Sequence, residues 1–379
     1  MNATLRLGAT GFALIAICYG LARFAFGLFL PEVRADLGLT PSFAGGIAGG
    51  SFLGYCLAIV ASAALVERYG PRPVAMGAGI VAASGMALIA VAQSPAILAA
   101  AVLFAGTSTG LASPPLAAAV ALSVQRQRQN AVNTVINSGT SAGVALSGPV
   151  ALYLGADWRL AYGVFAMAAA LVTTATLWTV PKTRANASHV ARGLPRFSAD
   201  LVILVTAAFL MGVASTAVWS FGGELVSRNL GWESRAIGVL WIVIGASGIA
   251  GAMAGALCAR FGVNAVQLAS LLGLAVGIGL IGTSITTPVL VMTGGALFGA
   301  AYILLTGVYL VWGVSALPDR PASGLTVAFL AIAIGQTAGA PIFGSVLEAF
   351  GAGGAATLFA GIALSAGIAR RRPLSVATS

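Results

Sequence analysis

Long apolar stretches dominate the chain and are separated by short polar, Pro-rich or Gly-rich breaks. Each stretch approaches or exceeds the ~20 residues that cross a bilayer as a helix. None shows the period-two alternation of a membrane β-barrel strand. Thr40 and Pro41 mark one boundary clearly, since they suit the N-cap and first turn of a helix. The pattern predicts twelve transmembrane helices, at 7–30, 41–66, 73–92, 97–122, 131–154, 159–180, 200–226, 236–259, 264–284, 289–314, 323–345 and 355–369.

The composition excludes an ordinary soluble protein. Of the 379 residues, 59% are hydrophobic and only 7% are charged, whereas soluble domains carry about 25% charged residues. The 50 glycines suit close helix packing in lipid. The three cysteines lie in apolar runs and the single histidine lies in a polar segment, so we expect neither a disulfide framework nor a metal site. We therefore expect an all-α integral membrane protein without a metal or other cofactor.

The basic residues predict the orientation of the helices. With the N-terminus inside, fourteen of the 19 Lys and Arg residues fall in inner segments and four in outer segments, while Arg23 lies within a span. This bias follows the positive-inside rule and predicts a multi-pass protein of the cytoplasmic (inner) membrane with both termini in the cytoplasm. It also accounts for the net charge of +10 without a nucleic-acid partner. We expect the lipid bilayer and a small solute as partners, and a monomer.

A basic segment divides the spans six and six. Residues 181–199 carry four basic residues and no acid until Asp200, so they read as a cytoplasmic linker. We expect two six-helix bundles at 1–180 and 200–372, followed by a short tail at 373–379.

Two sequence matches relate the halves. Gly139-Thr140-Ser141-Ala142-Gly143 recurs 196 residues later as Gly335-Gln336-Thr337-Ala338-Gly339. The loop at 63–72 likewise matches the loop at 255–264, with an offset of 192. Repeated halves with a site at their interface are a transporter architecture.

With these features the chain resembles the major facilitator superfamily of secondary transporters. Both loops are similar to that family's G-x-L-A-D-R-x-G-R-R/K motif, although Glu67 replaces the Asp in the first loop and Ala259 replaces it in the second. The run Tyr19-Gly20-Leu21-Ala22-Arg23-Phe24-Ala25-Phe26-Gly27 is similar to the YbfB/YjiJ-like branch. The resemblance implies two pseudo-symmetric six-helix bundles and transport by alternating access. It also implies a conformational latch between the halves, here formed by Glu67, Arg68, Gly70, Arg72, Arg260 and Gly262, with Glu67 facing Ser323 and Gly324.

Arg23 is the most informative polar residue. A charge deep in a lipid-facing helix costs about 2.5–3.5 kcal/mol, a cost avoided when the residue faces a wet cavity or a partner. Tyr19, Arg23 and Phe26 share one helical face by i, i+4, i+7 spacing. A guanidinium suits a carboxylate or phosphate. We expect Arg23 to face a solute cavity; a structural arginine that bonds carbonyls or points toward Glu32 or Asp36 is the alternative.

Other polar and aromatic residues within the spans extend this hypothesis. The 196-residue offset places Trp219 opposite Arg23, while Tyr302, Thr306 and Tyr309 share a face of the tenth span. The remaining candidates for solute contact are Asn137 and Gln336. Helix–helix hydrogen bonding and aromatic packing are the alternative roles for all of these side chains.

The sequence favours transport over catalysis. It has no phosphate-binding G-x-x-x-x-G-K-[ST] motif and no paired nucleophile and base at membrane depth. All acids lie near span ends, and Glu224 is the candidate for proton coupling. We expect a small organic anion or an amphipathic acidic solute, since Arg23 is the clear intramembrane charge. Export of neutral or aromatic drug-like solutes is one alternative, and a non-transporting membrane sensor or scaffold is another.

Overall fold

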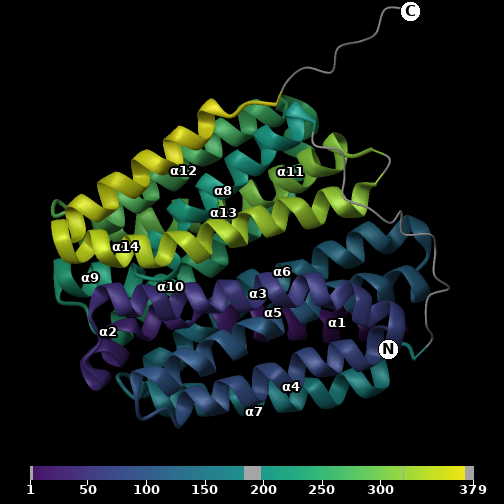
Figure 1. The fold of residues 1–379 in the computed structure, drawn as a ribbon, viewed down its shortest axis with the longest axis horizontal. Helices are drawn as coiled ribbons and strands as arrows, with labels where there is room; N and C mark the ends of the chain where they lie inside the picture. Colours follow the sequence, from purple (N-terminus) through teal and green to yellow (C-terminus); the bar gives the residue numbers. More distant parts are fainter. Residues whose placement is uncertain (1–2, 183–197, 319, 372–379) are drawn as a thin grey trace, which may run out of the picture.

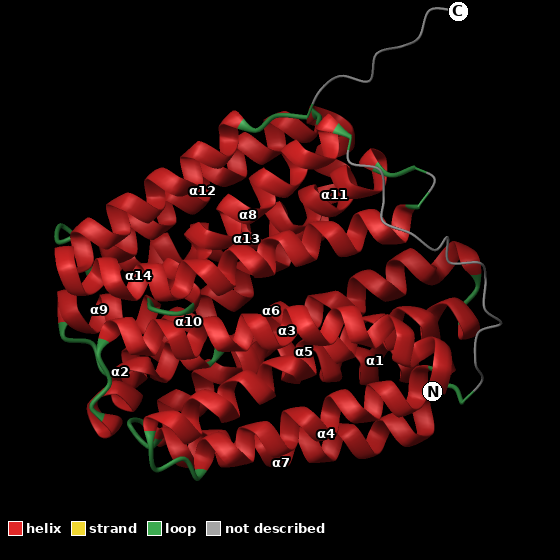
Figure 2. Cartoon of the chain, viewed as in Figure 1, coloured by secondary structure: helices red, strands yellow, loops and turns green. Residues whose placement is uncertain are grey.

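The computed structural model describes residues 3–182, 198–318 and 320–371. Every regular element in these ranges is helical (Figure 2). The first half contains α1 (Ala3–Ile15), the π-helix η1 (Ala16–Phe24), α2 (Phe26–Leu37), α3 (Pro41–Tyr69), α4 (Pro71–Ala90), α5 (Pro95–Ser123), α6 (Arg126–Leu154) and α7 (Trp158–Thr179). The second half contains α8 (Ala199–Trp219), α9 (Gly222–Leu230), α10 (Ser234–Ser247), η2 (Gly248–Met253), α11 (Ala254–Phe261), α12 (Val263–Gly282), α13 (Pro288–Ala316), α14 (Pro321–Ser365) and η3 (Ala366–Ile368).

These elements confirm the twelve predicted spans. The first span is the continuous run α1–η1–α2, the seventh is α8 with α9, and the eighth is α10 with η2 and α11. The last two spans lie within α14 and meet at Gly351, whose backbone leaves the helix at φ 70° and ψ 179°. Ten helical runs in the described part of the chain are long and apolar enough to cross a membrane. This number counts α14 once and does not include the fifth span, α6, which is the most polar. The helices of the first and fifth spans, α1 and α6, begin four and five residues before the predicted apolar stretches, because helical hydrogen bonding continues into polar sequence.

The internal repeat appears in the backbone. Gly70 and Gly262 end matching helices with nearly the same positive φ, 84° and 82°. Gly143 lets α6 pack against the first span, where an added Cβ would lie 2.1 Å from the Ala16 carbonyl oxygen. Its counterpart Gly339 lets α14 pack closely on α8 in the second half. The two halves therefore use the same turn and the same helix contact.

The halves lie side by side and have two distinct ends (Figure 1). We call the end where α1 and α8 begin the linker end, and the end where α2 and α9 finish the closed end. At the closed end the backbones of the two halves touch through glycines. An added Cβ would lie 2.1 Å from the Trp219 carbonyl oxygen at Gly27 and 2.4 Å from the Ala340 carbonyl oxygen at Gly45. Glycine at these positions lets the halves meet without intervening side chains.

Candidate functional site

The π-helix η1 sets the direction of the side chains in the first span. Its hydrogen bonds run from i+5 to i, as between the Ala25 amide and the Gly20 carbonyl oxygen at 3.0 Å. Because a π-turn holds more residues than an α-turn, Phe24 shares the face of Tyr19 and Arg23. All three side chains line the central cavity described below.

Arg23 is held between the two halves. It is only 6% exposed, and its Nη2 donates a hydrogen bond of 2.5 Å to Oε1 of Gln336 on α14. Its guanidinium carbon lies 4.6 Å from the ring centroid of Phe52, 4.7 Å from that of Tyr55 and 5.0 Å from that of Phe24. Aromatic faces stabilise a desolvated cation, each by about 0.5–2 kcal/mol. The guanidinium of Arg23 therefore lies in a largely aromatic environment that favours a cation.

Gln336 connects Arg23 to two helices of the second half. A guanidinium can only donate, so the amide oxygen of Gln336 faces Arg23 and its nitrogen points the other way. That nitrogen donates to Ser215 Oγ and to Tyr302 Oη, both at 3.1 Å. The amide is fully buried and fixed at three points. The amide occupies one of the two N–H groups of Arg23 Nη2 and leaves the other N–H group of that atom to other acceptors.

Aromatic rings continue from Arg23 into the second half. Trp219, at the end of α8, stacks on Phe24 with 4.2 Å between ring centroids. The edges of Phe298 and Tyr302 meet the same indole at 5.2 and 5.1 Å. These contacts close the cavity on the side that faces the closed end.

A cavity of about 420 Å³ lies between the halves beside Arg23. This volume suits a small organic molecule. Its wall combines aromatic rings with amides and hydroxyls, and the described lining residues are Tyr19, Arg23, Phe24, Tyr55, Thr134, Val135, Asn137, Ser138, Thr140, Ser141, Gly248, Ile249, Gly251, Ala252, Tyr302, Ile303, Thr306, Gly307, Leu310, Phe329, Ile332 and Gln336. Arg23 is the one charged residue among them.

The cavity faces the linker end. Its α6 wall belongs to the part of α6 nearer its start, and its α13 wall to the part nearer the end of α13. Both parts lie on the linker side of Arg23. The exposed side chains of Thr134, Val135 and Asn137 mark where this wall meets the surroundings.

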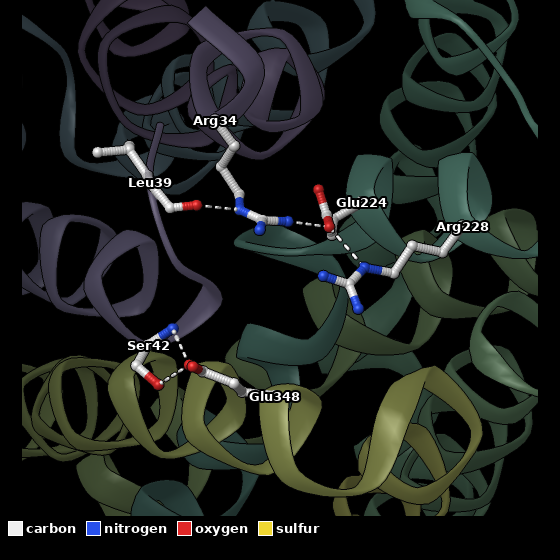
Figure 3. Close-up of polar contacts among 6 residues, drawn as sticks. All are labelled: Arg34, Leu39, Ser42, Glu224, Arg228 and Glu348. Atoms are coloured by element: carbon white, nitrogen blue, oxygen red, sulfur yellow. Dashed lines mark hydrogen bonds and ion pairs between the residues drawn. The ribbon is translucent and has the colours of Figure 1, made fainter. Parts of the chain in front are cut away.

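Polar contacts join the halves at the closed end (Figure 3). Glu224 on α9 is 5% exposed and accepts hydrogen bonds through Oε1 from Arg34 on α2 and, at 2.6 Å, from Nε of Arg228. Ser42 donates to Oε2 of Glu348 at 2.5 Å. A further bond runs from Ser234 in the second half to Glu32 in the first. The structure is thus closed at this end and has its cavity toward the other.

The sequence profile of the Major Facilitator Superfamily matches residues 12–340. The chain belongs to this superfamily. This major facilitator is 27% identical over 380 residues to a chloramphenicol resistance protein of Streptomyces lividans, a match that covers 96% of this chain and 87% of the relative. Its fold is similar to that of the nucleoside transporter NupG, with a TM-score of 0.76, 15% identity and coverage of 97% of this chain and 98% of the other. A variant of NupG gives a TM-score of 0.79 at 14% identity with the same coverage. The protein is therefore a multi-pass membrane transporter and not an enzyme.

Six of the nine expected solute contacts of this major facilitator line the cavity. They are Tyr19, Arg23, Asn137, Tyr302, Thr306 and Gln336. The hydroxyl of Tyr19 is also hydrogen-bonded to Ser113 Oγ at 2.8 Å.

The other three expected contacts lie elsewhere. Phe26 falls behind Arg23, because η1 shifts the helical register by which Tyr19 and Phe26 were expected to share a face. Trp219 does not line the cavity itself but packs against two residues that do, Phe24 and Tyr302. Tyr309 is fully buried, and its hydroxyl donates to the Ala207 carbonyl oxygen, which is the packing role foreseen as the alternative.

The alternative placement of Arg23 toward an acid does not occur in the described residues. Asp36 pairs with Arg159 and Glu32 accepts from Ser234, so both acids have partners at the closed end. Sequence reasoning missed Phe24 and Tyr55 as cavity residues. Tyr55 could have been proposed as a cavity residue because it is a polar aromatic residue in the middle of the apolar second span. Phe24 could not, because its position on the cavity face depends on the π-helix.

The expected latch residues lie at the linker end. Glu67 and Arg68 are exposed, and Arg72 donates to the Val180 carbonyl oxygen at 2.6 Å. Among the described side chains no ion pair or hydrogen bond joins Glu67 to Ser323 or Gly324. Gly324 instead packs against Gly313 of its own half. A latch that holds the linker end shut would form only in the opposite state, so this expectation stays a prediction.

Proposed function

We propose that this chain moves small amphipathic organic anions across the cytoplasmic membrane by alternating access, with its linker end in the cytoplasm. The observation that carries this proposal is the charge of the cavity, whose described wall contains one guanidinium and no carboxylate. A fixed cation in a confined, low-dielectric space attracts an anion and repels a cation. The rings of Tyr19, Phe24 and Tyr302 would enclose the apolar part of the solute.

Neutral aromatic solutes are the second candidate. Arg23 already has an acceptor in Gln336 and four aromatic rings around it, which supports a structural role. The relative named as a chloramphenicol resistance protein supports export of a drug-like molecule. Aromatic stacking and the amides and hydroxyls of α6 would then carry recognition. A third class, a sensor that binds solute without moving it, is an outcome of the same test.

The contacts at the closed end supply a mechanism for alternating access. Arg34, on the first half, and Glu224, on the second, must separate before that end opens. A proton delivered to Glu224 would remove the charge that holds Arg34, so Glu224 is our candidate for proton coupling. The basic residues of the linker end support its cytoplasmic placement, and one chain contains both halves of the cavity, which supports a monomer.

The decisive experiment compares solutes in proteoliposomes that contain wild-type protein or single variants. Uptake of anionic, neutral and cationic aromatic solutes is measured with and without a pH gradient, for wild type, Arg23→Gln and Arg23→Lys. Arg126→Gln is the matched control, because Arg126 is exposed and does not line the cavity.

We expect Arg23→Gln to weaken binding of the transported anion by about tenfold or more, since it removes a charge-assisted hydrogen bond. Arg23→Lys should retain part of that affinity, and Arg126→Gln should behave as wild type. Unchanged anion affinity in a folded Arg23→Gln protein refutes the anion site, and a neutral solute carried equally by both proteins supports the second candidate. Saturable binding with no flux for any solute identifies a sensor.

A further inference from the structure

Four buried polar groups on the closed-end side of the central cavity, one of them Nε of Arg23, have no hydrogen-bond partner among the described residues. Their residues are between 2% and 6% exposed. The atoms are Arg23 Nε, Ser51 Oγ, Trp219 Nε1 and Ser220 Oγ. They come from η1, from α3, from the end of α8 and from the residue that follows it, so both halves contribute.

These four residues surround one small space. It is separate from the central cavity and lies on its closed-end side, with Phe26, Ala48 and Phe52 completing the wall. The centre of a water-sized sphere can move within it through about 10 Å³. The space therefore suits a single small occupant and excludes a solute of the size that the 420 Å³ cavity accepts.

The four polar groups in the wall are all able to donate hydrogen bonds. The guanidinium and indole N–H groups can only donate, and each serine hydroxyl can donate. Leaving such groups unsatisfied costs about 1–3 kcal/mol each, and more for a charged one. The wall contains no carboxylate, and the acceptor of Arg23 on the opposite side is the neutral oxygen of Gln336. An occupant that accepts from all four groups and carries one negative charge would satisfy each of them.

We propose that this space, formed by Arg23, Ser51, Trp219 and Ser220, is a binding site for a single halide ion, with chloride as the physiological ligand. A buried water molecule is the competing occupant. Water can accept from the two N–H groups and donate to the two hydroxyls, but it leaves the guanidinium charge without a counter-ion. A halide accepts from all four groups and offsets that charge, whose burial is otherwise costly.

We expect the halide concentration to change the electrostatic potential inside the central cavity. A halide bound behind Arg23 would reduce the positive potential that attracts an anionic solute on the other side. Halide binding itself does not depend on which solute is transported. It can therefore be measured on the purified protein without any transport assay.

The test measures thermal unfolding of the purified protein at constant ionic strength while gluconate is replaced by chloride or bromide. A ligand that binds only the folded protein raises Tm in a saturable way. We expect such a rise for wild type. Ser51→Ala and Trp219→Phe should each shift its midpoint to about tenfold higher halide, because each removes one hydrogen bond to a charged ligand. In a crystal soaked in bromide, an anomalous peak should lie beside Arg23 Nε.

Ser62→Ala is the matched control. Ser62 is also buried on α3 with an unpartnered hydroxyl, but it does not border this space. It should leave the halide response as in wild type. A response that does not saturate, or that is the same in Ser51→Ala, Trp219→Phe and wild type, overturns the proposal. Density beside Arg23 Nε without a bromide signal identifies the occupant as water and overturns it as well.

Discussion

The contact between Arg34 and Glu224 should govern how often the closed end opens. Both Arg34 and Arg228 donate to the same oxygen of Glu224 (Figure 3). The Arg228 contact lies within α9 and does not join the halves, so of these two contacts only the one with Arg34 must break when the halves separate. Glu224→Gln keeps the shape and the accepting oxygen and removes the charge.

The expected magnitude follows from the burial of this pair. The two side chains are 17% and 6% exposed, so solvent screens their contact little. A hydrogen bond to a charged group contributes about 1.5–3 kcal/mol and is roughly twice as strong as a neutral one. Glutamine retains the neutral part, so the closed state loses about 1 kcal/mol relative to the open state. The ratio of open to closed molecules should rise about fivefold.

Spin labels at Ala35→Cys and Glu233→Cys, one exposed position on each half at the closed end, report the opening as a distance distribution. The three native cysteines are buried, so they either remain unlabelled or are replaced before the labelling positions are introduced. The control is Asp36→Asn. It breaks the ion pair with Arg159 at the same end, but both partners belong to the first half.

We expect Glu224→Gln to increase the population with the longer distance, and Asp36→Asn to leave it unchanged. An unchanged distribution in Glu224→Gln would show that the other contacts between the halves, such as the glycine contacts and the bonds of Ser42 and Ser234, hold this end shut. An equal increase in both variants would show a general effect of charge removal, and the reasoning would be wrong in either case.

Three further predictions concern the glycine contacts, the latch and the orientation in the membrane. Gly27→Ala should destabilise the closed end by about 1–3 kcal/mol, because its Cβ would lie 2.1 Å from a carbonyl oxygen of α8. Gly46→Ala is the control and should have no such effect, because there is open space around Gly46. The same spin-label distances report the effect of both variants. Glu67→Gln should make the linker end open more often if Glu67 belongs to a latch, and unchanged reactivity of cysteines lining the cavity would exclude that role. A membrane-impermeant thiol reagent applied outside intact cells should label Glu233→Cys and spare Gln127→Cys, and the reverse result would invert the proposed orientation.

The sequence predicted the fold because hydropathy and charge operate over whole helices. The twelve spans, the two halves and the turns at Gly70 and Gly262 could all be read from local patterns, since each depends on a stretch of neighbouring residues. The start of α3 is an example, where Thr40 accepts a hydrogen bond from the Phe43 amide at 3.2 Å and Pro41 follows it.

The cavity was less predictable because it depends on helical register and on contacts distant in sequence. The i, i+4, i+7 rule placed Phe26 beside Arg23, but η1 brings Phe24 there instead. Gln336 could be suggested from its polarity in an apolar span, but its bond to Arg23 joins residues 313 positions apart. Likewise, Glu224 stood out as an acid near a span end, while its partner Arg34 is 190 positions away. No local pattern encodes such pairs.

The glycine contacts at the closed end have a consequence for the speed of switching. Helices that interlock through large side chains must disengage them before they part, which raises the activation barrier. Here Gly27, Gly45 and Gly344 set backbone directly against backbone, with no interlocking side chains at these points. Separation at these glycines breaks van der Waals contact without a change of rotamer. The kinetics of opening then depend on the stack of Phe24 on Trp219 and on a small number of polar bonds between the halves. The turnover rate can therefore be tuned by changing single residues while the fold stays the same.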